Sequence, residues 1–285
     1  MYSPRFDYHR AESIDHALRL LSSLDGDVKL LAGGHSLVPA LKLRLASPSH
    51  LIDISACSEL KGVREEDGRV LIGAATSYRE LESDPLLAAR VPLVPVVAGQ
   101  VADMLVRNRG TIGGSLCNSD PNADFPVCVL ALDARLHVRS LGEERAIAVS
   151  DWFDGLMSTA LRPDEVLESI SVAAPRQQVR CGYVKVKHAA SRFGVACAAA
   201  NLGVSGDGRV ASAAIALGGL ADHPVRLAGL EASLVGREAH DLAQGLQIQE
   251  QLAAAIPDLP PPRQWLLHVA AGAIRKALGQ CTSAA

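Results

Sequence analysis

Glycines and hydroxyl side chains concentrate in the stretch from residue 107 to residue 126. They lie within a short run of positions: Gly110, Thr111, Gly113, Gly114 and Ser115. Glycine can take positive φ and lets a ligand approach the backbone without a Cβ in the way. Successive backbone N–H groups can also form a concave nest that holds an anion without a lysine. We therefore predict a pyrophosphate-binding loop here, with a pair of tight turns as the alternative.

A second glycine stretch follows a short apolar run. Residues 28–32 read as a buried strand, and Gly33, Gly34, His35 and Ser36 come directly after it. A strand that ends in this way offers free backbone N–H groups to an anion. Neither stretch is Gly-x-Gly-x-x-Gly or a P-loop, which argues against an ordinary NAD site and against a nucleoside triphosphatase. Together the two loops are suited to gripping both phosphates of a dinucleotide from opposite sides.

Four segments carry a resemblance to a known family: AGGHS at 32–36, KLRLA at 42–46, LIDI at 51–54 and RNRGTIGGS at 107–115. These segments resemble the FAD-binding subunit of molybdenum hydroxylases, and above all the medium, flavoprotein subunit of aerobic carbon monoxide dehydrogenase and its relatives. The resemblance extends over nearly the whole chain, because the length and the order of the later segments also fit. It does not fix the substrate, because in that family a different subunit meets the substrate.

The resemblance implies that FAD contacts the two loops and three residues further along the chain. The implied contacts are Ala32, Gly33, Gly34, His35, Ser36, Thr111, Ile112, Gly113, Gly114, Ser115, Asp124, Leu161 and Lys185. Asp124 would accept hydrogen bonds from ribose hydroxyls; the alternative is a helix N-cap, which Asp favours. Lys185 would reach back to the cofactor, and its alternative is an exposed strand lysine.

Several other side chains near these motifs leave two roles open. His35 is tempting as a catalytic group, but its place inside a phosphate loop favours a hydrogen-bonded loop histidine. Many members of the resembling family carry glutamine at this position, and glutamine cannot form a covalent bond to flavin. We therefore expect FAD to be bound non-covalently. Phe193 beside Gly194 fits either the isoalloxazine face or the core. For Lys42 and Arg44 a solvated face is favoured over a charge near the flavin phosphates.

Spacing supports no Ser-His-Asp arrangement and no metal-ligand cluster, and the carboxylate pairs Glu65–Glu66 and Glu143–Glu144 lie in polar segments. The chemistry is therefore expected from the cofactor. The resemblance implies a complex in which a molybdenum-containing large subunit oxidises substrate and a small [2Fe–2S] subunit relays electrons to this FAD. The FAD would then pass these electrons to an external acceptor such as NAD⁺, a quinone or oxygen. A stand-alone FAD-dependent oxidoreductase and a non-catalytic FAD-binding interaction protein are the alternatives.

Composition narrows the class of protein further. The 285 residues, 48% of them hydrophobic, suffice for two or three small domains. The net charge of −3, with both signs interleaved, gives no basic stripe for nucleic acid. Six scattered cysteines without a Cys-x-x-Cys pair favour free thiols in a reducing compartment over an iron–sulfur or zinc site. Without a signal segment or a long apolar window, we expect a cytoplasmic protein with no transmembrane segment.

The apolar pattern predicts an α+β fold in three parts. Two α/β subdomains, residues 1–55 and 56–175, come first, and residues 176–285 would form an antiparallel sheet with helices. The resemblance implies that the two subdomains hold FAD in their crevice as in PCMH-type domains. Helices are expected after Ser13 (14–24), after Thr76 (76–81), from Asp84–Pro85, and at 93–103, 124–131, 226–235, 238–255 and 263–278. Strands are expected at 28–32, 51–54, 69–73, 135–139, 145–149, 183–187, 196–204 and 210–217.

Overall fold

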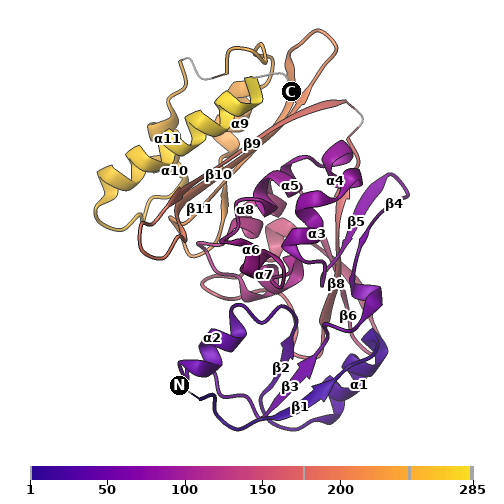
Figure 1. The fold of residues 1–285 in the computed structure, drawn as a ribbon. Helices are drawn as coiled ribbons and strands as arrows, with labels where there is room; N and C mark the ends of the chain where they lie inside the picture. The colour runs from indigo at the N-terminus through magenta and orange to yellow at the C-terminus, as the bar shows by residue number, and fades with distance from the viewer. Residues whose placement is uncertain (1, 176, 243–244, 283–285) are drawn as a thin grey trace.

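The computed structural model describes residues 2–175, 177–242 and 245–282 of the chain. The fold is α+β, as the sequence predicted, and it is built on three separate sheets that follow one another along the chain (Figure 1). The first sheet lies near the N-terminus, the second lies in the middle, and the third is covered by the C-terminal helices.

The first sheet is parallel, with strand order β1-β3-β2. Its strands are β1 (Asp7–Arg10), β2 (Val28–Leu31) and β3 (His50–Asp53). Helix α1 (Ile14–Ser23) begins as predicted at Ser13, whose side chain accepts a hydrogen bond from the backbone N–H of His16. Ile14 and Leu18 of this helix pack with Ile52 of β3 in a small core, so the short helix is held by its apolar face rather than by length.

The second sheet has five antiparallel strands in the order β4-β5-β8-β6-β7. They are β4 (Val63–Glu66), β5 (Arg69–Gly73), β6 (Arg135–Arg139), β7 (Glu144–Ala148) and β8 (Val166–Ala173). The predicted hairpin is confirmed as β6 and β7, in which Arg135 pairs with Ala148 and Arg139 pairs with Glu144. Two short 3-10 helices, Ser58–Leu60 and Val149–Asp151, flank the strands.

Six short helices lie between β5 and β6: α3 (Tyr78–Ser83), α4 (Pro85–Arg90), α5 (Leu93–Ala98), α6 (Met104–Arg107), α7 (Ile112–Asn118) and α8 (Asp124–Ala131). Every residue of α8 is buried, as the apolar run that follows Asp124 requires. One core joins α8 to the second sheet and to inner residues of the third, such as Ala199 and Ala216. Helix α8 is therefore the central element between the two sheets.

Two helix boundaries in the middle part of the fold differ from the prediction. Helix α3 is capped by Ser77, which forms a capping box with Glu80, and not by Thr76. The Thr76 hydroxyl instead bonds the backbone of Gly62, at 3.0 Å from its N–H. The helix expected at 93–103 ends at Ala98, because Asp103 itself caps the next helix by accepting a bond from Val106 N–H. In both cases a cap residue close to the expected boundary sets where a helix begins: Ser77 for α3 and Asp103 for α6.

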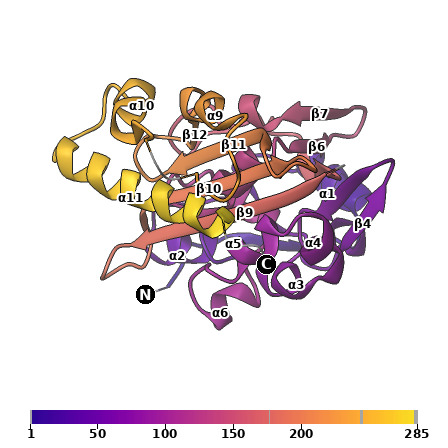
Figure 2. The same cartoon turned by 90° about the horizontal axis from the view of Figure 1, so that it is seen from above.

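The third sheet is the predicted antiparallel meander, with strand order β12-β11-β10-β9. Its strands are β9 (Gln178–Lys187), β10 (Gly194–Val204), β11 (Val210–Gly218) and β12 (Val225–Arg226). The helices that follow are α9 (Ala228–Leu234), α10 (Ile248–Ala255) and α11 (Arg263–Thr282). Figure 2 shows α11 lying across β9 and β10. Helix α8 packs on the other face of this sheet, because it shares a core with Ala199 whereas α11 shares a core with Ala198 (Figure 1).

The helix expected at 238–255 is wrong in its first half. Helix α10 begins only at Ile248, and the described residues 238–242 and 245–247 are not helical; positions 243 and 244 lie outside the described residues. Gly245 has φ of +68°, which breaks a helix at that point. Elsewhere, no helix among the described residues combines the length and apolarity needed to cross a bilayer.

The contact between β9 and α11 generates a stability prediction. A Cβ on Gly182 of β9 would overlap the carbonyl oxygen of Ala277, so Gly182→Ala must push the helix off the sheet. We expect a loss of about 1–3 kcal/mol in unfolding free energy, measured by thermal or urea denaturation. Gly272→Ala in α11, whose Cβ would meet open space, is the control and should be neutral or stabilising by up to about 1 kcal/mol. Equal stability of the two variants would contradict the close contact.

Candidate functional site

A cleft of about 1070 Å³ runs between the three parts of the fold. Its walls come from the loop after β2, from α7 and the start of α8, from the loop before β8, and from β9 with the turn that follows it. Every residue that the sequence assigned to the site, apart from Ile112, lines this cleft. Ligand sites are commonly concave and lie between domains, which makes this cleft the candidate site.

The two glycine loops touch each other. A Cβ on Gly33 would overlap the carbonyl oxygen of Arg109 and would lie 2.8 Å from the Cα of Gly110. Gly34 has φ of +77°, whereas Gly113 and Gly114 lie outside the left-handed region. The expectation of positive φ is therefore correct for Gly34 and wrong for the glycines of the second loop. Those glycines instead permit close packing.

The second loop is the start of helix α7 rather than an open nest. Thr111 is its N-cap, and the Thr111 hydroxyl accepts a hydrogen bond of 3.1 Å from Gly114 N–H. The N–H groups of Ile112 and Gly113 donate to the carbonyls of Thr76 and Ala74. These backbone donors are already used within the protein, so the loop offers the cleft mainly its surface and the Ser115 side chain.

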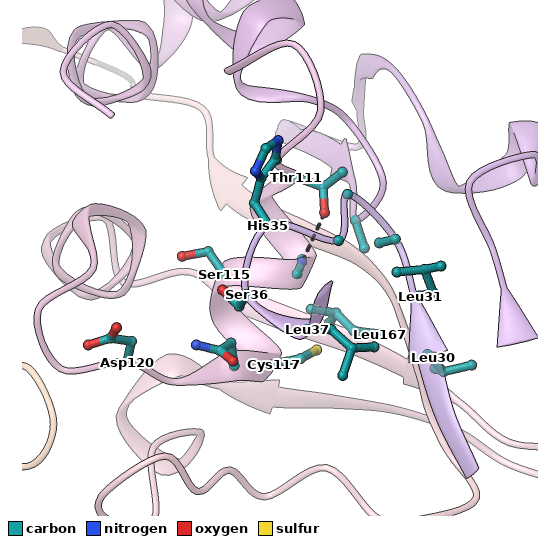
Figure 3. A pocket seen from close by; sticks show the side chains of 18 of the residues that line it. Leu30, Leu31, His35, Ser36, Leu37, Thr111, Ser115, Cys117, Asp120 and Leu167 are labelled. Atoms are coloured by element: carbon teal, nitrogen blue, oxygen red, sulfur yellow. Dashed lines mark hydrogen bonds between the residues drawn. The ribbon is translucent and has the colours of Figure 1, made fainter. Parts of the chain in front are cut away.

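Free backbone donors lie instead in the first loop. Within the described chain, the N–H groups of residues 33–36 donate no hydrogen bond to another protein group. His35 and Ser36 are exposed at the cleft, and Figure 3 shows this loop beside Thr111 and Ser115. No hydrogen bond of the His35 ring is found in the described part either, so the expected hydrogen-bonded loop histidine is wrong. A row of unpaired N–H groups at a strand end is suited to holding phosphate oxygens.

Asp124 and Lys185 form a buried ion pair at the cleft. Their side chains are 5% and 4% exposed, and Lys185 Nζ lies 2.7 Å from Asp124 Oδ2. Tyr183 Oη donates to Asp124 Oδ1 at 2.5 Å. The alternative roles are therefore wrong: Ala123 is the N-cap of α8, and the lysine is not exposed. A lysine ammonium has three donors, and Asp124 is its only partner among the described residues, so two donors remain for a ligand.

Tyr183 does not line the cleft but supports the site through its bond to Asp124, and the sequence analysis missed it. Burial, and then the charge of Asp124, raise the pKa of Tyr183 well above its ordinary value, so the phenol stays protonated and donates. The signal was present, because residues two apart on a strand point to the same face. Tyr183 therefore had to lie on the same face of β9 as Lys185.

Leu161 lines the cleft from a loop that Glu165 holds in place. Both carboxylate oxygens of Glu165 are bound by Arg145, from Nε at 2.7 Å and from Nη2 at 2.8 Å. The backbone N–H of Arg162 donates to the same carboxylate at 2.7 Å. Hydrogen bonds from Arg145 lower the pKa of Glu165, since they favour its ionised form. The loop beside the cleft is thus fixed by a bidentate ion pair.

The remaining expectations have clear outcomes. Phe193 is 51% exposed and lines the cleft, so the core role is wrong. Lys42 and Arg44 are exposed and away from the cleft lining, which confirms the solvated face.

Burial raises the pKa of the Cys117 thiol to about 12, so this cleft residue is a poor nucleophile at neutral pH. In the described ranges, no three His, Cys, Asp or Glu side chains gather as metal ligands.

Free backbone donors, a buried ammonium and an exposed aromatic ring in one long cleft are typical of a protein that binds a dinucleotide cofactor. Comparison with family models matches residues 4–175 to the FAD binding domain in molybdopterin dehydrogenase and residues 182–265 to the CO dehydrogenase flavoprotein C-terminal domain. The chain therefore belongs to the family of FAD-binding subunits of molybdopterin dehydrogenases. FAD is its cofactor, as the sequence predicted, and the donor set of the cleft fits a pyrophosphate.

Individual relatives agree with this assignment. The carbon monoxide dehydrogenase medium chain of Hydrogenophaga pseudoflava is 40% identical over 83% of this chain and 82% of its own length. The glyceraldehyde dehydrogenase medium chain of Sulfolobus acidocaldarius is 35% identical over 85% of each. A chain of reconstituted CO dehydrogenase from Oligotropha carboxidovorans superposes with a TM-score of 0.91 at 34% identity, covering all of both chains. The protein is an oxidoreductase subunit of this type.

The contact between the glycine loops generates a binding prediction. Gly33→Ala must separate the loops, because its Cβ would overlap the Arg109 carbonyl oxygen. We expect FAD affinity to fall by about tenfold or more, equivalent to about 1.4 kcal/mol, with an unchanged circular dichroism spectrum. Quenching of flavin fluorescence measures the affinity. Gly142→Ala, whose Cβ meets nothing within 4 Å, is the control. Full flavin occupancy in Gly33→Ala would contradict this role.

The pair between Arg145 and Glu165 generates a pH prediction. Because the folded-state pKa of Glu165 is lowered, its ionised form stabilises the fold above the unfolded pKa of about 4.3, and this contribution is lost as pH falls through the lowered value. Arg145→Gln should cost about 1–3 kcal/mol near pH 7, measured by thermal denaturation from pH 7 to 3. The gap to wild type should narrow below about pH 4. A gap independent of pH would contradict the ion pair; Arg64→Gln, in an exposed pair with Glu66, is the control.

Proposed function

We propose that this chain is the electron-transfer subunit of a three-subunit molybdenum hydroxylase complex. Electrons from substrate oxidation at a molybdenum-containing large subunit would pass through a small [2Fe–2S] subunit to FAD in this cleft, and from there to an external acceptor. The observation that carries the proposal is the cleft itself, which offers cofactor-binding groups from all three parts of the fold. Relatives named as carbon monoxide dehydrogenase and glyceraldehyde dehydrogenase chains both match most of this chain in sequence, which supports a role that does not depend on the substrate.

In this proposal different residues of the cleft bind different parts of the cofactor. Backbone N–H groups of residues 33–36 and the Ser115 side chain bind the pyrophosphate. The ammonium of Lys185, fixed by Asp124, donates hydrogen bonds to the cofactor, and Leu161 forms an apolar wall. Phe193 is assigned to the isoalloxazine face, because a half-exposed phenylalanine in a cleft gains by covering a ligand ring. FAD supplies one-electron and two-electron redox chemistry when bound.

FAD is held without a covalent bond in this proposal. The His35 side chain is exposed beside the backbone donors of its own loop, where it serves phosphate binding and not attachment of a flavin ring. Cytoplasmic location is part of the same proposal, and it is supported by six free cysteines, which are typical of a reducing compartment.

Purification of the full chain from its native host tests the proposal. We expect two further subunits, molybdenum, iron and acid-labile sulfide to copurify, and acid precipitation to release the flavin into the supernatant. The complex should reduce its flavin with substrate, whereas the chain alone should not, because its groups bind the cofactor and another subunit oxidises the substrate. Substrate-dependent flavin reduction by the lone chain, at the rate of the complex, would overturn the proposal and favour a stand-alone oxidoreductase. Flavin retained in the acid pellet would overturn non-covalent binding.

A further inference from the structure

Tyr183 is fixed by hydrogen bonds of its backbone and its hydroxyl as well as by packing. It is fully buried on β9, the edge strand of the third sheet. Its backbone N–H donates to Gln280 Oε1 at 2.8 Å, and its carbonyl accepts a long bond of 3.5 Å from Gln100 Nε2. These two amide side chains satisfy the backbone of an edge strand at this residue. The backbone and the hydroxyl of Tyr183 are therefore both fixed.

The hydroxyl of Tyr183 is the first member of a chain of charge-assisted hydrogen bonds. The phenol is kept protonated by burial, so its hydroxyl donates to Asp124 Oδ1. The second oxygen of Asp124 accepts from Lys185. Each carboxylate oxygen thus has its own partner, and the carboxylate cannot rotate without breaking a bond. The ammonium of Lys185 is fixed in turn.

We propose that Tyr183 is a positioning residue that acts through Asp124 to hold the Lys185 ammonium toward the cofactor. Without the hydroxyl, Asp124 Oδ1 would be a buried acceptor with no partner among the residues that the structure describes, which is costly. The carboxylate would then compete for a second bond from the ammonium and draw it away from the cleft. This inference rests on the proposed function, because it concerns the same cleft.

Tyr183→Phe tests the inference in the full chain, because it removes only the hydroxyl and keeps the ring in the core. We expect FAD affinity, measured by quenching of flavin fluorescence, to fall about tenfold, as for a lost hydrogen bond to a charged group. The midpoint potential of the bound flavin should also become more negative, because a nearby cation favours added electrons. A merely structural role would not move the potential. Unchanged affinity and potential would overturn the inference.

A double-mutant cycle with Asp124→Asn separates positioning from direct contact. If Tyr183 acts through the carboxylate, Tyr183→Phe should change FAD affinity less than about twofold when Asp124→Asn is already present. The same loss in both backgrounds would overturn the route through Asp124. Tyr8→Phe is the matched control, because it removes another tyrosine hydroxyl bound to an aspartate, Asp53, at 2.6 Å and outside the cleft. It should leave the affinity unchanged.

The outcomes distinguish this inference from the proposed function. If wild type binds no FAD in its complex, the proposed function fails; if wild type binds FAD and Tyr183→Phe binds equally well, only the positioning role fails. Should Tyr183→Phe not fold, Gln280→Ala takes its place in the same cycle. Gln280 is exposed and bonds the Tyr183 backbone, so its loss should weaken FAD binding in the same direction and by a smaller factor. No loss in that variant would then overturn the role.

Discussion

The buried ion pair between Asp124 and Lys185 constrains the rest of the structure. A charge removed from water must be paired, and removing one partner of a buried pair is strongly destabilising. Asp124 begins α8 of the middle part, and Lys185 lies on β9 of the third sheet. The pair therefore fixes how the third sheet lies against the helices. It also places a cation at the cleft, so the constraint on folding and the preparation of the site depend on the same contact.

Local signals predicted much of the fold. Helix α8 was predicted with its observed bounds, because eight residues of nearly continuous apolarity start at an aspartate. The caps Ser13 and Asp84 were also predicted, since each precedes a helical pattern and accepts a bond from the first turn. The meander was predicted from alternating strands about a glycine turn. In each case the deciding contacts lie close in sequence.

The rest of the site depends on contacts between distant residues. No local pattern could show that Gly33 lies against Arg109, or that Arg145 holds the loop of Leu161 through Glu165. The motif resemblance brought Asp124 and Lys185 to the site, and the alternation of side chains along β9 places Tyr183 beside Lys185, but only the structure shows that Tyr183 bonds Asp124. Glycine in the second loop was interpreted as a means to positive φ, whereas in the structure it permits neighbouring atoms to pack closely against the backbone. The sequence thus pointed to residues that line one cleft, and the structure adds how they pack.

The cleft draws its walls from all three parts of the fold, from Leu21 to Phe193. None of the three parts can offer the complete set of donors by itself. The complete set of cofactor-binding groups therefore exists only when the third sheet is docked on α8. Bound flavin is yellow, so the colour of the protein reports that the cleft is complete. A molecule that holds its flavin has therefore assembled every layer that lines the cleft.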